Sequence, residues 1–226
     1  MINPQQIMGL NPSHVVPVNE QHFLLPEVRD VFYEMQAAGA EAGVDFQICS
    51  SFRSFDKQLS IWNRKWRGEL PLYSINGEAL NAHELSDTEK LHAILTWSAL
   101  PGGSRHHWGT DFDFFDRAKV EASAHQLELI PEEYEDQGPC ADLASWVHEQ
   151  SAAFGFYLPY AKFTGGVARE PWHLSFQTLA EQIQASFNID ALSEQLNNSD
   201  MLGKECVLSC LPELVRRYTY NKGISE

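Results

Sequence analysis

The sequence predicts an α+β domain in which helices flank a small antiparallel sheet. Segments with helical and with strand periodicity are mixed along the chain, without regular strand–helix–strand alternation. The 226 residues, 43% of them hydrophobic, suffice for one sizeable core. From residue 178 onward the pattern is helical. We therefore expect a single domain over residues 1–226, with a core at about 25–177 and an additional helical C-terminal extension at about 178–226.

The predicted core opens with a helix, a strand and a second helix. Apolar residues recur at helical spacing within 25–42, where Pro26 suits the first turn and Gly43 can end the helix. Residues 44–51 alternate between apolar and polar side chains, which is the pattern of a strand. Ser54 can cap the next helix. Its apolar stripe is Phe55, Leu59, Trp62 and Trp66.

The middle of the chain combines an irregular segment with a further helix. Residues 67–85 are rich in turn formers and predict an insertion without regular structure. Ser86 and Glu89 form a capping-box pattern, which opens a helix that runs to about Leu100. The sequence Pro101-Gly102-Gly103 then ends it.

Two short predicted strands carry chemically useful side chains. The segment 110–115 alternates, with Asp111 and Asp113 on one face and two phenylalanines on the other. The segment 172–176 also alternates, and it places His173 on the face opposite three apolar residues.

The chain is acidic, with 31 acidic and 16 basic residues and a formal net charge of −15. This charge repels phosphate backbones and anionic lipid surfaces, so we expect neither nucleic acid nor a membrane as a partner. No run approaches the ~20 apolar residues that cross a bilayer, and the first residues lack the pattern of a secretory signal. We therefore expect a cytoplasmic protein, with a periplasmic or released form left open. No pattern predicts an oligomeric state.

Two clusters of residues are suited to a catalytic metal site. The first runs from Ser104 to Asp113 and contains His106, and the second is Glu170-Pro171-Trp172-His173. A catalytic zinc takes about three protein ligands and leaves a fourth position for water. The loop histidine, the strand aspartate and the second-strand histidine could supply the three ligands, with Glu170 as a nearby base. On spacing alone, a polar loop with ordinary hydrogen-bond partners is the commoner explanation.

The two clusters resemble known signatures. The first resembles the S-x-H-x-x-G-x-x-x-D pattern of the D-alanyl-D-alanine carboxypeptidases of the VanY type, and the second resembles their E-x-W-H pattern. The stretch from Ser51 to Ser54, followed by Gln58, is similar to that family's S-x-Y-R-S-x-x-x-Q pattern, with Phe52 in place of the commoner tyrosine. The three matches occur in the family's order and bracket positions 51–173.

The resemblance implies a zinc metallopeptidase and a role for each matched residue. It implies that His106, Asp113 and His173 bind Zn²⁺, and that Glu170 is the general base for the water that zinc activates. It also implies that three further residues bind substrate, namely Arg53, Gln58 and Ser104. An arginine fork grips a carboxylate in two places, which suits an enzyme that trims a C-terminal residue.

Two residues of the first cluster leave alternatives open. His107 adjoins the proposed ligand and is a second choice for it, although the spacing to Asp113 favours His106. Asp111 stands where the family usually has a small apolar residue. We expect it to orient a ligand histidine or cap a turn, and only secondarily to bind metal.

The activity implied by the resemblance is D,D- or L,D-carboxypeptidase action on peptidoglycan stem peptides. Three alternatives stay open: a D-alanyl-D-alanine dipeptidase, a cell-wall endopeptidase, and a non-catalytic zinc-fold binding module. The presence of Glu170 and all three ligands argues against the last. We expect the insertion at 67–103 to determine how the pocket is closed.

Overall fold

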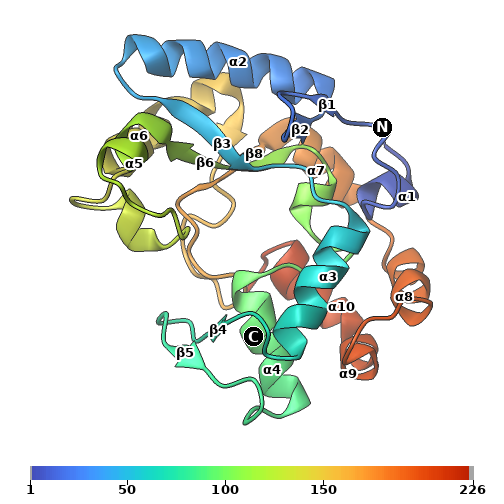
Figure 1. Cartoon of the computed structure of the whole chain (residues 1–226). Coiled ribbons are helices and arrows are strands. Elements are labelled where there is room, and N and C mark those ends of the chain that lie inside the picture. The colour runs from blue at the N-terminus through green and yellow to red at the C-terminus, as the bar shows by residue number, and fades with distance from the viewer. Residues whose placement is uncertain (1, 224–226) are drawn as a thin grey trace.

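A four-stranded antiparallel sheet with the order β3–β6–β8–β7 stands at the centre of the molecule (Figure 1). The computed structural model describes residues 2–223. The strands of this sheet are β3 (Phe46–Ser50), β6 (Asp111–Asp116), β7 (Phe156–Tyr157) and β8 (His173–Phe176). Two short hairpins lie outside it, β1 (Val16–Pro17) with β2 (Phe23–Leu24), and β4 (Leu72–Tyr73) with β5 (Ala79–Leu80). The predicted α+β class with a small antiparallel sheet is therefore confirmed.

The helices divide between the two sides of the sheet. On one side lie α2 (Pro26–Glu41), α5 (Arg117–Ala122) and α6 (Ala141–Gln150). Below the sheet in Figure 1 lie α3 (Phe55–Trp66), α4 (Asp87–Trp97), α8 (Ile189–Asn197), α9 (Lys204–Ser209) and α10 (Leu211–Leu214). The remaining elements are α1 (Pro4–Ile7), α7 (Gln177–Ala185), the 3₁₀ turns η1 (Arg105–His107), η2 (Pro131–Tyr134) and η3 (Ser151–Phe154), and the π-helical turn η4 (Val215–Thr219).

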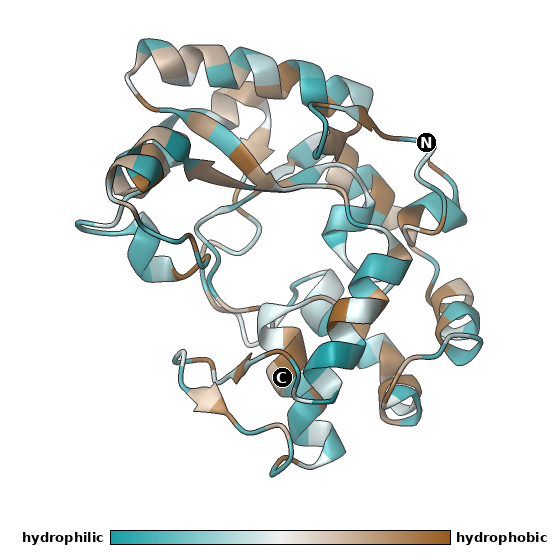
Figure 2. Cartoon of the chain, viewed as in Figure 1, coloured by the Kyte–Doolittle hydropathy of each residue, from teal (hydrophilic) through white to brown (hydrophobic). Residues whose placement is uncertain are grey.

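The strand faces separate apolar from polar side chains as the alternation predicts. Phe112 and Phe114 of β6, with Leu174 of β8, are fully buried in one cluster with Phe32 of α2 and Val147 of α6. Brown bands along α2 and the strands beneath it mark this cluster in Figure 2. The opposite face of the same strands is therefore left to polar residues.

A second hydrophobic cluster lies on the other side of the sheet. Trp62 of α3 and Leu91 of α4 are fully buried there, together with Leu192 and Leu196 of α8 and Val207 of α9. The C-terminal extension thus packs against α3 and α4 and shares their core. The site described below lies between the two clusters.

The observed helix boundaries agree closely with the sequence pattern. Ser54 caps α3, and Ser86 caps α4 with Glu89 completing the capping box. The fourth helix ends at Trp97, three residues before the predicted end at Leu100. The segment 67–85 is irregular except for the β4–β5 hairpin, which was not predicted.

No helix within residues 2–223 is long and apolar enough to span a membrane. The four cysteines, Cys49, Cys140, Cys206 and Cys210, are free thiols.

Candidate metal centre and its cleft

Two paired strands and one 3₁₀ turn bring the proposed ligands together. Asp113 of β6 and His173 of β8 are direct partners in the strand register. His106 lies on η1, where its backbone carbonyl accepts a hydrogen bond from the Arg53 amide at 3.2 Å. Gly109 turns the chain from η1 towards β6 with a φ of 74°, and a Cβ there would lie 2.5 Å from Val15 Cγ1. The glycine of the first signature is therefore required by backbone shape and by space.

The side chains of these three residues form one compact group, the metal group. His106, Asp113 and His173 each offer a ligand atom within 4.8 Å of the others, and all three residues are buried. His106 Nε2 lies 3.4 Å from Asp113 Oδ2, and His173 Nδ1 lies 3.0 Å from Asp113 Oδ1. Neighbouring ligand atoms of a tetrahedral zinc site lie about 3.3 Å apart, so the observed spacing matches that of a zinc site.

The group also contains a buried polar atom that is free to bind an ion. Asp113 Oδ1 is buried and has no hydrogen-bond partner in the described part of the chain, although His173 Nδ1 is close. The approach of these two atoms therefore lacks hydrogen-bond alignment. Buried polar atoms are seldom left unpaired, and atoms that converge without bonding one another are suited to a shared ion. Two imidazoles and one carboxylate are also a donor set that zinc accepts.

The electrostatics of the group favour positive charge at its centre. Burial alone would raise the pKa of Asp113, but the charges of His106 and His173 hold this pKa well below its usual range. Burial lowers the pKa of His173, but the hydrogen bond to Asp111 and the charges of Asp113 and Asp111 outweigh it and raise this pKa to about 10. A divalent cation would meet the same demand for positive charge.

Asp111 supports His173 from behind. Its Oδ1 lies 3.0 Å from His173 Nε2, so the imidazole can present Nδ1 to Asp113. Thr110 and Ser175 donate hydrogen bonds to the other carboxylate oxygen at 2.5 and 3.1 Å. The expected orienting role of Asp111 matches this geometry, which is a common arrangement behind histidine ligands.

Arg105 completes the buried network, and sequence reasoning missed it. Its Nε donates to Asp111 Oδ1 at 2.7 Å, and its Nη2 donates to Ser175 Oγ at 2.7 Å and to the Tyr157 hydroxyl at 3.0 Å. The guanidinium also lies over the Trp108 ring, 4.7 Å from its centroid. A buried arginine that neutralises Asp111 explains how this carboxylate replaces the usual apolar residue. Only the unusual Asp111 itself pointed to such a partner.

Glu170 lies beside the metal group without joining it. Its Oε2 is 3.6 Å from His173 Nδ1, and 13% of its side chain is exposed. Burial, with Asp113 nearby, raises its pKa to about 8. A carboxyl group that titrates near neutral pH is suited to accept and return a proton.

Arg53 faces the same cavity and is held by two neighbours. Its Nη1 donates to Gln58 Oε1 at 2.8 Å, and its Nη2 donates to Ser50 Oγ at 3.1 Å. Within residues 2–223 it has no carboxylate within 4.0 Å, so several of its donors remain for a ligand. Burial lowers the pKa of its guanidinium, while the charges of Asp113 and Glu170 oppose this effect.

Gln58 and Ser104 differ in their relation to the cavity. Ser104 lines it, and its buried hydroxyl has no partner among residues 2–223. Gln58 is fully buried behind Arg53, and its amide donates to the Ala99 carbonyl at 2.7 Å. The structure thus gives Gln58 a positioning role and not the expected place on the pocket wall.

His107 lies outside the metal group. Its Nε2 accepts the backbone N–H of Gly102 at 3.0 Å, so its proton belongs on Nδ1, which donates to the Arg53 carbonyl at 2.5 Å. Burial lowers its pKa to about 3, which keeps the ring neutral. Both ring nitrogens are therefore occupied by backbone groups, and His106 is the histidine that faces Asp113.

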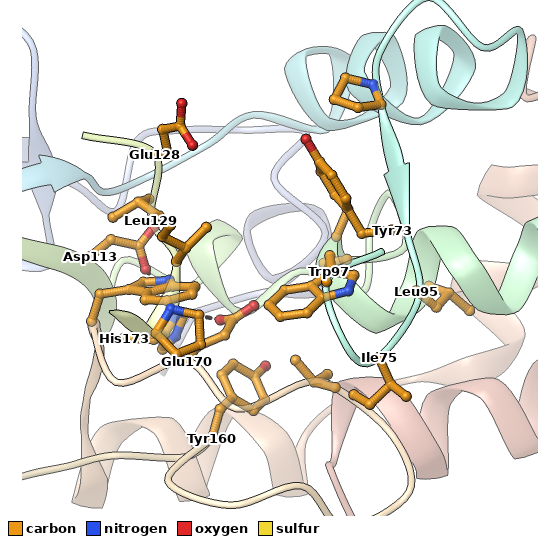
Figure 3. A pocket seen from close by; sticks show the side chains of 18 of the residues that line it. Tyr73, Ile75, Leu95, Trp97, Asp113, Glu128, Leu129, Tyr160, Glu170 and His173 are labelled. Carbon is orange, nitrogen blue, oxygen red and sulfur yellow. Dashed lines mark ion pairs between the residues drawn. The ribbon is translucent and has the colours of Figure 1, made fainter. Parts of the chain in front are cut away.

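The metal group opens into a cavity of about 890 Å³. In Figure 3, Asp113, Glu170 and His173 lie on one side, and Tyr73 and Ile75 of the β4–β5 hairpin lie on the other, with Trp97 between them. Leu129 and Glu128 border the metal side. Residues of the insertion at 67–103 therefore form a wall of the cleft.

Comparisons with known proteins give a consistent result. The family model described as VanY, D-alanyl-D-alanine carboxypeptidase, matches residues 21–179. An uncharacterized protein of Haemophilus influenzae is 34% identical over 126 residues, which cover 55% of this chain and 95% of that protein.

Solved structures show the same fold at lower identity. VanYB in complex with D-alanine-D-alanine has a TM-score of 0.52 and 21% identity, with 82% of this chain and 89% of that chain covered. The LdcB LD-carboxypeptidase has a TM-score of 0.55 and 18% identity, with 83% and 86% covered.

Proposed function

Because the chain belongs to the VanY D-alanyl-D-alanine carboxypeptidase family, we propose that it is a zinc-dependent carboxypeptidase that removes the C-terminal D-alanine from peptidoglycan stem peptides. One observation carries the proposal. The three-residue group of His106, Asp113 and His173 shares a single cavity with the carboxylate of Glu170 and with Arg53, which has no carboxylate partner within residues 2–223.

Glu170 is the proposed proton carrier of the reaction. Zinc bound by His106, Asp113 and His173 would supply a Lewis acid that polarises the scissile carbonyl and lowers the pKa of water. Glu170 accepts one proton as the water oxygen bonds to the carbonyl carbon. It then delivers this proton to the leaving nitrogen as the C–N bond breaks. Burial raises the pKa of Glu170 from the usual range of a carboxyl group towards neutral pH, which suits a group that accepts a proton and returns it.

Arg53 is the proposed anchor for the substrate's terminal carboxylate. Two of its donors are used by Gln58 and Ser50, which fixes the direction of the guanidinium. The remaining donors can bind a carboxylate in the fork geometry. Ser104 can add a hydroxyl donor from the same wall.

The size of the cavity supports a substrate longer than a free dipeptide. The cavity continues from the metal group past Trp97 to the β4–β5 hairpin. A dipeptidase gains nothing from this length, whereas a stem peptide can occupy it.

The first test is metal content together with D-alanine release. The purified protein should contain one zinc per chain and should release D-alanine from a muramyl pentapeptide, with loss of activity after chelation. Release from the pentapeptide indicates D,D-specificity, and release from the tetrapeptide indicates L,D-specificity. Zinc without release from either peptide would count against this proposal and favour an endopeptidase, which a crosslinked muropeptide dimer would reveal. Absence of stoichiometric metal would refute the proposed site.

A further inference from the structure

The C-terminal end of α3 carries three basic residues with different partners. Arg64 and Arg67 both approach the carboxylate of Glu69, at 3.8 and 2.5 Å. Lys65 lies between them in sequence but lines the cavity that contains the metal group. One basic side chain of this turn is therefore directed into the cleft, away from the ion pairs of its neighbours.

The Lys65 ammonium is incompletely paired. Its Nζ donates to the Pro71 carbonyl at 3.2 Å, whereas an ammonium group has three donors. Nowhere in residues 2–223 does a carboxylate lie within 4.0 Å of it. Burial lowers its pKa, which indicates that water covers the group only in part. A cation in this setting gains from any anion that reaches it.

The position of Lys65 relates it to the proposed substrate path. Its partner Pro71 directly precedes β4, and Tyr73 of that strand lies across the cavity from His173 in Figure 3. Lys65 therefore marks the hairpin end of the cleft, whereas Arg53 lies with the metal group. A peptide held at Arg53 by its terminal carboxylate would extend past Trp97 towards Lys65.

We propose that Lys65 binds a second carboxylate of the substrate, one located upstream of the released residue. The subsite selects peptides in which that upstream carboxylate is free over peptides in which it is amidated. This inference rests on the proposed function, because it takes the released residue to lie at the metal group.

The charge of the cavity disfavours a polyanionic ligand. Glu128 and Glu132 also line the cavity, and the chain carries a net charge of −15. These charges repel polyanions such as nucleotides. A peptide with separate carboxylates and an amino group can place a carboxylate at Lys65 and its amino group near these glutamates.

The test uses binding, so that it does not depend on turnover. Three pentapeptides of the sequence L-Ala-γ-D-Glu-meso-diaminopimelyl-D-Ala-D-Ala serve as probes: one with all carboxylates free, one amidated at D-glutamate and one amidated at diaminopimelate. Their dissociation constants are measured by calorimetry with the zinc-loaded protein in a Glu170→Gln background. We expect one of the amidations to weaken binding about tenfold, as the loss of a charge-assisted hydrogen bond does.

Three further substitutions locate the effect. Lys65→Met keeps most of the side-chain stem and should abolish the discrimination between free and amidated peptides. Lys65→Arg keeps the charge and should retain it. Lys57→Met, on an exposed residue of the same helix, should leave all three dissociation constants unchanged.

The outcomes separate this inference from the proposed function. If all three peptides bind equally or not at all, or if Lys65→Met discriminates as well as the parent protein, the subsite is refuted. In that case the role of Lys65 is structural: its hydrogen bond to the Pro71 carbonyl holds the start of β4 against α3. D-alanine release is followed separately with Glu170 intact. Release without Lys65-dependent discrimination refutes the subsite alone. Discrimination without release retains the subsite and refutes the carboxypeptidase activity.

Discussion

At the scale of single residues, Glu170 and the proposed metal ligands should respond differently to substitution. Glu170→Gln should retain zinc near one per chain and lower kcat by about 10²- to 10⁴-fold, because a proton carrier is lost but no ligand is. His173→Ala should lose zinc and activity together. Zinc by mass spectrometry and D-alanine release, measured on the same samples, check both. Loss of zinc from Glu170→Gln would show that this carboxylate is itself a ligand.

His107 provides a second contrast at this scale, with its neighbour His106. We expect His107→Ala to lower the free energy of unfolding by about 2–3 kcal/mol, because the buried Gly102 N–H and Arg53 carbonyl lose their partners. The folded fraction should still bind one zinc per chain. His106→Ala is the matched comparison and should lose the metal. If His107→Ala also abolished zinc binding while its fold remained intact, the assignment of the ligand histidine would have to change.

Sequence reasoning named the candidate ligands and base but not the residues that support them. His106, Asp113 and His173, with Glu170 beside them, could be proposed because their spacing resembles a family signature, and strand alternation placed Asp111 on the same face as Asp113. Arg105 could not be identified, because its partners Asp111, Ser175 and Tyr157 come together only through the pairing of β6, β8 and β7.

At the scale of elements, one buried carboxylate organises the loop that borders the metal side of the cleft. Glu133 accepts from the backbone N–H groups of Glu128 and Ile130 at 2.8 and 3.1 Å, and lies 2.5 Å from His125 Nε2. Leu129, between the two backbone donors, has a φ of 58°. This left-handed conformation is costly for leucine, so the hydrogen bonds to Glu133 must hold it.

Glu133→Gln should therefore loosen this loop and widen the cleft. We expect KM to rise severalfold with little change in kcat, and the free energy of unfolding to fall by about 1–3 kcal/mol. Steady-state kinetics on the pentapeptide and denaturant unfolding measure the two effects. Glu121→Gln, on an exposed residue of α5, is the control and should change neither. An unchanged KM in Glu133→Gln would mean that the loop does not contact substrate.

The elements that the sequence predicted well are those with local signals. Ser54 and the Ser86–Glu89 pair are caps that act within one turn, and both were found. The β4–β5 hairpin was not predicted, because its order depends on a distant contact: Trp97 Nε1 donates to the Ser74 carbonyl at 3.0 Å. The same holds for the loop fixed by Glu133.

At the scale of the whole molecule, the cleft lies where two hydrophobic clusters meet. Asp113 and His173 belong to strands of the sheet cluster, whereas Tyr160 belongs to the other cluster and its ring packs against His173 at 4.9 Å between centroids. Gln58, which holds Arg53, is on α3 of that second cluster. The geometry of the site therefore depends on the relative position of the two clusters.

The extension after residue 177 should consequently unfold together with the site. Leu196 of α8 is fully buried in the cluster that contains Trp62, so Leu196→Ala should lower the free energy of unfolding by about 2–5 kcal/mol. Because the cluster is shared, far-UV circular dichroism and tryptophan fluorescence should report one coincident transition in both the parent protein and the variant. Zinc should raise the midpoint of that transition in each. Leu10→Ala, at a residue that is 37% exposed, should have little effect. An early transition in Leu196→Ala that releases the helices while zinc stays bound would instead establish the extension as a separate folding unit.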